Sequence, residues 1–115
     1  MKRFSHGFGH ALRGIRYAFT GRNFRIQAAC AVIVLFLAYL LRITSTELII
    51  VIAMIGLVLS MEATNSAVEE ICNKFHPETH PHIALIKDLA AGAVLLASLT
   101  ALAVGLIIFL PYLAK

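Results

Sequence analysis

The sequence predicts an all-α membrane protein: three transmembrane helices per chain, preceded by an amphipathic helix on the membrane surface. Hydrophobic residues make up 60% of the 115 positions, more than a domain of this size can bury in water. The apolar residues fall into three long runs separated by short polar segments. Six of the ten basic residues precede the first run: Lys2, Arg3, Arg13, Arg16, Arg22 and Arg25. We therefore expect a single integral membrane domain over residues 1–115 and no nucleic-acid partner, because a soluble basic face is missing.

Residues 1–24 have the pattern of an amphipathic surface helix. Five large apolar residues recur at spacings of four, four, three and four: Phe4, Phe8, Leu12, Ile15 and Phe19. These spacings place them on one helix face, while most of the basic residues fall on other faces. The segment is too charged to span, so we expect it to lie on an anionic bilayer surface.

The first span is predicted over residues 26–41, which are apolar apart from Gln27. At 1.5 Å per residue these residues reach about 24 Å, just short of a typical hydrocarbon core. A short turn follows, and Thr46 is the residue expected to cap the next helix.

The second span is predicted over residues 48–67, because its purely apolar part, residues 48–61, is too short to cross a membrane. Continuing the helix holds Glu62, Asn65 and Ser66 at the depth of the interface. A carboxylate is costly there, so these residues are functional candidates.

The third span is predicted over residues 89–110, between a polar loop at residues 73–82 and Pro111. Small residues recur along it at intervals of three and four residues: Ala90, Ala93, Ala97 and Ala101. This spacing favours close packing against another helix.

The distribution of lysine and arginine predicts the orientation of the chain. Eight of these residues lie in the N-terminal segment and the 62–88 segment, whereas the opposite side has Arg42 and Lys115. Positive residues favour the cytoplasmic side. We therefore expect a multi-pass protein of the prokaryotic plasma membrane, with its N-terminus and the 62–88 loop in the cytoplasm.

The second span carries a stripe of polar residues at helical positions 0, 3, 4, 7 and 11: Glu62, Asn65, Ser66, Glu69 and Asn73. Lys87 and Asp88 open the third span and can approach this stripe. Two carboxylates and a lysine suit phosphoryl transfer, with one acid as base, another holding Mg²⁺ on ATP, and the lysine on phosphate. The sequence has no glycine-rich phosphate loop, which excludes Walker-type and protein-kinase-type sites.

Other readings of these residues stay open. The polar stripe would also serve simply to hold helices together within the membrane. A zinc site is disfavoured, because His76, His80 and His82 alternate with prolines and have no cysteine partner. A small multidrug transporter is less favoured, since such proteins have four spans and a deep acid in the first.

The segment Glu62-Ala-Thr-Asn65-Ser66-Ala-Val-Glu69, followed by Lys87-Asp88 and Ala90-Ala-Gly92-Ala93-Val, resembles the prokaryotic diacylglycerol kinase and undecaprenol kinase family. The resemblance extends over nearly the whole chain. It implies a homotrimeric helical bundle that phosphorylates a membrane lipid alcohol with ATP and Mg²⁺. The run that follows Lys87 and the segment Arg22-Asn23-Phe24-Arg25 look more like the undecaprenol kinase branch than the diacylglycerol kinase branch.

The resemblance also implies roles for individual residues. Glu62 would accept the proton of the lipid hydroxyl, with Asn65 positioned beside it and Ser66 near the lipid. Glu69 would bind both ATP and its Mg²⁺. Four further residues would contact ATP: Glu78, His80, Lys87 and Asp88.

Two residues depart from the family pattern. Gly21 stands where the family usually has a glutamate that completes the metal site, and Asn73 stands where an aspartate is common. Both changes remove acidity. They raise the alternative of a catalytically impaired membrane scaffold subunit with the same fold.

Overall fold

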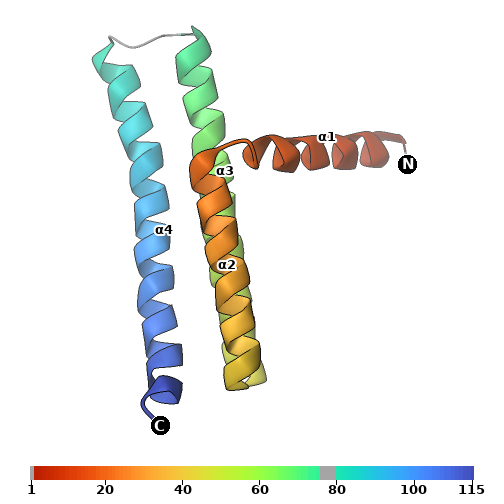
Figure 1. Cartoon of the computed structure of the whole chain (residues 1–115). Helices are drawn as coiled ribbons and strands as arrows, with labels where there is room; N and C mark the ends of the chain where they lie inside the picture. The colour runs from red at the N-terminus through yellow and green to blue at the C-terminus, as the bar shows by residue number, and fades with distance from the viewer. Residues whose placement is uncertain (1, 76–79) are drawn as a thin grey trace.

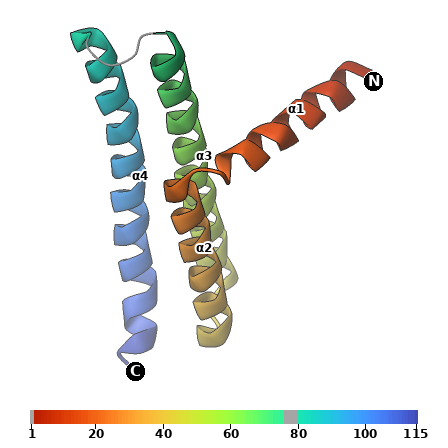
Figure 2. The same ribbon diagram turned by 45° about the horizontal axis from the view of Figure 1, so that its top comes forward.

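The computed structural model describes residues 2–75 and 80–115, and these residues form four helices (Figure 1). They are α1 (Lys2–Ala18), α2 (Arg22–Leu41), α3 (Ser45–Phe75) and α4 (Pro81–Leu113). Helix α3 packs against both α2 and α4. Helix α1 projects sideways from the other three in both views (Figures 1 and 2).

The prediction of an all-α chain with three membrane-spanning helices is confirmed. Helices α2 and α4, and α3 from Ser45 to Lys74, are each long and apolar enough to cross a bilayer. Many large side chains on their outer faces are exposed, including Val32, Phe36 and Ile107. Such faces are stable against lipid and unfavourable against water.

The helices extend beyond the predicted spans and into both ends of the predicted polar loop at residues 73–82. Asn73 still belongs to α3, and α4 begins at Pro81. Proline suits the first helical position because its missing N–H would have no partner there. The Nδ1 atom of His80 accepts the backbone N–H of His82 at 3.1 Å and caps this helix start.

Helix α4 continues past Pro111, the predicted end of the third span, to Leu113. Pro111 has no N–H to donate to the carbonyl four residues earlier, so one backbone hydrogen bond of the helix is lost there. The backbone N–H of Ala114 donates to the carbonyl of Leu110 at 3.0 Å and closes the last turn.

Thr44 caps α3, so the expectation that Thr46 caps this helix is also wrong. The Thr44 hydroxyl oxygen accepts the backbone N–H of Glu47 at 3.1 Å. Glu47 Oε1 in turn accepts the backbone N–H of Thr44 at 2.9 Å. This reciprocal pair is a capping box. Tyr112 of α4 donates its hydroxyl to the same Glu47 oxygen, which joins the end of α4 to the start of α3.

A small apolar core joins the three long helices near this end of the bundle. Its buried members come from α2, α3 and α4: Ala38, Val51, Ile108 and Phe109. The core and the Glu47 hydrogen bonds fix one end of the bundle, which leaves the opposite end to hold the polar stripe.

Helix α1 ends at Ala18, earlier than the predicted boundary at residue 24. A turn follows, in which the backbone N–H of Gly21 donates to the carbonyl of Ala18 at 3.0 Å. The Tyr17 hydroxyl donates to Glu70 Oε2 of α3 at 3.1 Å. This bond holds the α1–α2 turn beside the segment of α3 that carries the acidic residues, and it raises the pKa of Tyr17.

Candidate active site

Two polar residues of α3 are buried, and one side-chain oxygen of each has no hydrogen-bond partner among the described residues. Glu62 is 4% exposed and Asn65 is 8% exposed. Glu62 Oε2 and Asn65 Oδ1 accept no hydrogen bond from any residue that the structure describes. A buried polar atom without a partner costs free energy, so such atoms usually serve a ligand, an ion or a partner chain. Glu62 and Asn65 are therefore the centre of the candidate site.

Glu69 lies on the same face of α3 but is exposed. Asn65 Nδ2 donates to Glu69 Oε1 at 3.4 Å, so the amide lies between the two acids and leaves its own oxygen free. Glu69 comes seven positions after Glu62, about 10.5 Å along a helix. The Glu62 carboxylate is thus buried between the helices, and the Glu69 carboxylate is accessible to solvent.

Ser66 is half-buried, and its hydroxyl donates to the Glu62 carbonyl at 3.1 Å. The hydroxyl proton is therefore used within the helix. Ser66 can therefore interact with a ligand through its oxygen, as a hydrogen-bond acceptor.

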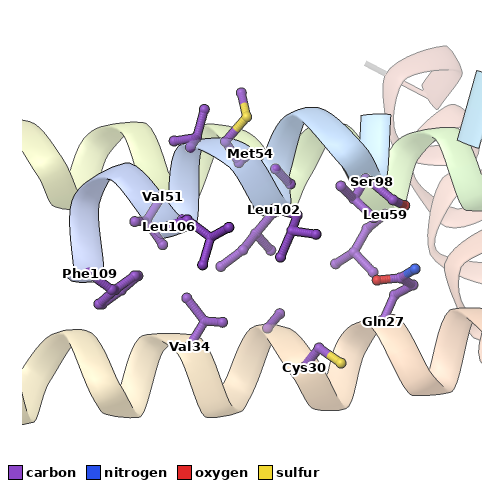
Figure 3. Close-up of a pocket in the computed structure, with 16 residues that line it drawn as sticks. Gln27, Cys30, Val34, Val51, Met54, Leu59, Ser98, Leu102, Leu106 and Phe109 are labelled. Atoms are coloured by element: carbon purple, nitrogen blue, oxygen red, sulfur yellow. The ribbon is translucent and has the colours of Figure 1, made fainter. Parts of the chain in front are cut away.

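Glu62 faces a hollow of about 330 Å³ between the three long helices. Its other lining residues come from α2 and α4: Asn23, Ile26, Gln27, Ala91, Val94, Leu95 and Ser98. A second, mainly apolar cavity of about 380 Å³ shares Gln27 and Ser98 with this hollow (Figure 3). Sequence periodicity missed both spaces, because three separate helices form them.

The start of α4 meets the far end of the stripe. Lys87 Nζ donates to Asn73 Oδ1 at 2.6 Å, so Lys87 contacts the last residue of the stripe and not Glu62. Asp88 is exposed. His80 stacks on His82 with ring centroids 5.3 Å apart. Glu78 lies outside the described residues.

The oxygens around Asn65 fit a metal that arrives bound to a nucleotide. Among residues 2–75 and 80–115, no three His, Cys, Asp or Glu side chains gather into a preformed metal site. Mg²⁺ in nucleotide sites usually takes one or two carboxylates and completes its shell with phosphate and water oxygens. Glu69 and the free Asn65 Oδ1 match that need. Gly21, in the α1–α2 turn, contributes no ligand.

Comparisons with known proteins identify the family of this chain. The sequence model of the family described as prokaryotic diacylglycerol kinase matches residues 9–109. An undecaprenol kinase from Bacillus subtilis is 39% identical over 112 residues, which cover 96% of this chain and 91% of that protein. A diacylglycerol kinase from Synechocystis is 38% identical over 106 residues, covering 90% of this chain and 61% of that protein. A diacylglycerol kinase from Haemophilus influenzae is 32% identical over 89 residues, covering 76% and 75%. This chain belongs to the prokaryotic diacylglycerol kinase family.

Proposed function

We propose that this protein transfers the γ-phosphoryl group of ATP to the hydroxyl of a membrane lipid alcohol at the cytoplasmic interface. The observation that carries the proposal is Glu62, a buried acid with an unpaired oxygen, two helical turns from the exposed Glu69. A lipid hydroxyl approaches from the hydrocarbon, and a nucleotide approaches from water. The α3 stripe presents one carboxylate to each.

Glu62 is the base in this proposal. As the lipid oxygen forms its bond to the γ-phosphorus, its proton passes to Glu62, and the bond from that phosphorus to the bridging oxygen of ADP breaks. Asn65 holds Glu69 through its N–H, and its own oxygen has no partner among the described residues. Ser66 Oγ is available to accept a hydrogen bond from the lipid head.

The nucleotide lies over the water-facing end of the stripe. Glu69 would hold a Mg²⁺ ion bound to ATP, and that ion would neutralise phosphate charge. Lys87 releases the neutral amide of Asn73 and binds phosphate. Asp88, His80 and Glu78 complete the nucleotide contacts that the family resemblance implies.

Helix α1 anchors this end of the protein to the cytoplasmic leaflet. Its apolar residues Phe4, Phe8 and Leu12 are exposed, and it projects sideways from the bundle (Figure 2). A helix in that orientation lies along a bilayer surface when α2–α4 cross it. Family members act as homotrimers, so the proposed active form is a homotrimer in the prokaryotic plasma membrane.

Undecaprenol is the favoured lipid. The likeness to an undecaprenol kinase extends over 91% of that relative, which supports this choice over diacylglycerol. A small multidrug transporter is not supported by a chain with three spans.

One observation favours a second candidate, a catalytically impaired scaffold subunit. Gly21 offers no carboxylate where relatives usually have one, and Asn73 is neutral. Both candidates share the fold, so only activity separates them.

The test is transfer of labelled phosphate from Mg²⁺·ATP to undecaprenol and to diacylglycerol by the purified protein. Glu62→Gln and Glu69→Gln should abolish transfer. Glu70→Gln is the matched control, because its amide oxygen still accepts the Tyr17 hydroxyl and the residue lies outside the stripe. A folded homotrimer that phosphorylates no lipid alcohol would favour the scaffold.

A further inference from the structure

Gln27 and Ser98 lie at the boundary between the hollow at Glu62 and the apolar cavity, and each lines both spaces. Figure 3 shows them at the same end of the cavity as Leu59, with Gln27 on α2 and Ser98 on α4. Leu59 precedes Glu62 by three residues, about 4.5 Å along α3. The polar pair therefore lies where the hollow at Glu62 passes into the apolar cavity.

The Ser98 hydroxyl differs from three other hydroxyls in these helices. Serine and threonine within a helix commonly donate to the carbonyl four residues earlier. Thr64, Ser66 and Thr100 do so, at 2.8, 3.1 and 2.8 Å. Ser98 Oγ is buried and has no hydrogen-bond partner in the described part of the chain. Its donor is free for a bound molecule.

The rest of the cavity suits a hydrocarbon chain. Apolar side chains such as Val34, Met54, Leu102 and Phe109 line it below the polar pair. Empty apolar cavities exclude water and bind apolar molecules. A lipid whose hydroxyl reaches Glu62 would therefore run its chain past Gln27 and Ser98 into this space.

The two candidate lipids differ at the depth of the pair. Undecaprenol has no polar atom besides its hydroxyl. Diacylglycerol has ester carbonyls only a few bonds from its free hydroxyl, and these are hydrogen-bond acceptors. Gln27 offers two amide N–H donors and Ser98 one O–H donor. The pair is thus complementary to a glycerol ester and has nothing to bind on a polyprenol.

We propose that Gln27 and Ser98 donate hydrogen bonds to an ester carbonyl of diacylglycerol, and so maintain diacylglycerol as a second substrate beside undecaprenol. The inference rests on the proposed kinase function and assigns lipid selectivity to two residues outside the polar stripe. Glu62 still performs the proton transfer.

The test compares three lipids in the same detergent micelles: dioleoylglycerol, its dialkyl ether analogue with the same chains, and undecaprenol. The ether analogue keeps the shape and the hydroxyl but lacks both carbonyls. The wild type should have a higher kcat/KM for the ester than for the ether. Ser98→Ala and Gln27→Leu should each lower this ester-to-ether ratio roughly three- to tenfold, the value of one hydrogen bond.

Two further variants separate recognition from structure. Ser98→Thr retains the hydroxyl and should preserve the ratio. Thr100→Ala removes a neighbouring hydroxyl that already bonds to the Leu96 carbonyl, and should also leave it unchanged. An unchanged ratio in active Ser98→Ala and Gln27→Leu enzymes, or an equal loss on all three lipids, would overturn this inference and leave the kinase intact. Transfer to none of the lipids by the wild type would overturn the kinase proposal and this inference with it.

Discussion

Lys87 Nζ lies 2.6 Å from Asn73 Oδ1, and this hydrogen bond ties the start of α4 to the end of α3. Asn73 comes four residues after Glu69, so its side chain occupies the next position on the same helix face. The amide therefore stands where a carboxylate could both pair with Lys87 and assist Glu69 with the metal.

Asn73→Asp should strengthen nucleotide binding. The added carboxylate supplies a second acid one turn from Glu69, where it could help to hold the Mg²⁺ of the nucleotide. We expect the KM for Mg²⁺·ATP to fall roughly two- to fivefold, as measured in the lipid phosphorylation assay. Asn73→Ala, which removes the bond without adding an acid, should not lower it. An equal fall in both variants would show that the acid is irrelevant.

Gly21→Glu should increase the affinity for Mg²⁺. The backbone of Gly21, at φ −80° and ψ 138°, is one that any residue adopts. A Cβ there would lie 3.4 Å from the nearest atom outside its immediate neighbours, the Ala18 carbonyl oxygen, so a side chain is accommodated with little adjustment. The Tyr17–Glu70 bond keeps this turn beside the acidic part of α3.

We expect the Mg²⁺ concentration for half-maximal activity of Gly21→Glu to fall roughly tenfold. Gly21→Gln is the control, because it has a similar size without the charge. If glutamate and glutamine give the same Mg²⁺ dependence, this position takes no part in metal binding here.

Thr44→Ala should destabilise the protein by about 1 kcal/mol, through loss of the N-cap of α3. Thermal or denaturant unfolding in detergent would measure the change. Thr46→Ala should leave stability unchanged or raise it by a few tenths of a kcal/mol, because Thr46 lies inside the first turn and alanine has the higher helix propensity. A larger effect at Thr46 than at Thr44 would contradict the capping box.

Local patterns in the sequence predict much of this fold. The three apolar runs locate α2, α3 and α4, and the spacing from Asn65 to Glu69 matches the hydrogen bond between them. The Thr44-x-x-Glu47 capping signal is also present in the sequence, although the expectation at Thr46 overlooked it. Helix ends are less predictable, because hydropathy marks contact with lipid and not the last hydrogen-bonded turn.

The contrast between a buried Glu62 and an exposed Glu69 follows from packing between helices. Both residues have the same helical phase, so periodicity treats them alike. Their difference depends on how α2 and α4 lie against α3, as does the placing of Gln27 opposite Ser98 (Figure 3).

The length of α3 links the site to the thickness of the bilayer. Its 31 residues extend about 46 Å, whereas a typical hydrocarbon core is about 30 Å thick. Glu62 and Glu69 are built into this continuous rod at fixed distances from its apolar part, with no hinge between them. A thicker membrane would draw Glu69 towards the hydrocarbon, and a thinner one would lift Glu62 into water. Membranes with different lipid chain lengths would therefore place the two carboxylates at different depths relative to the hydrocarbon core.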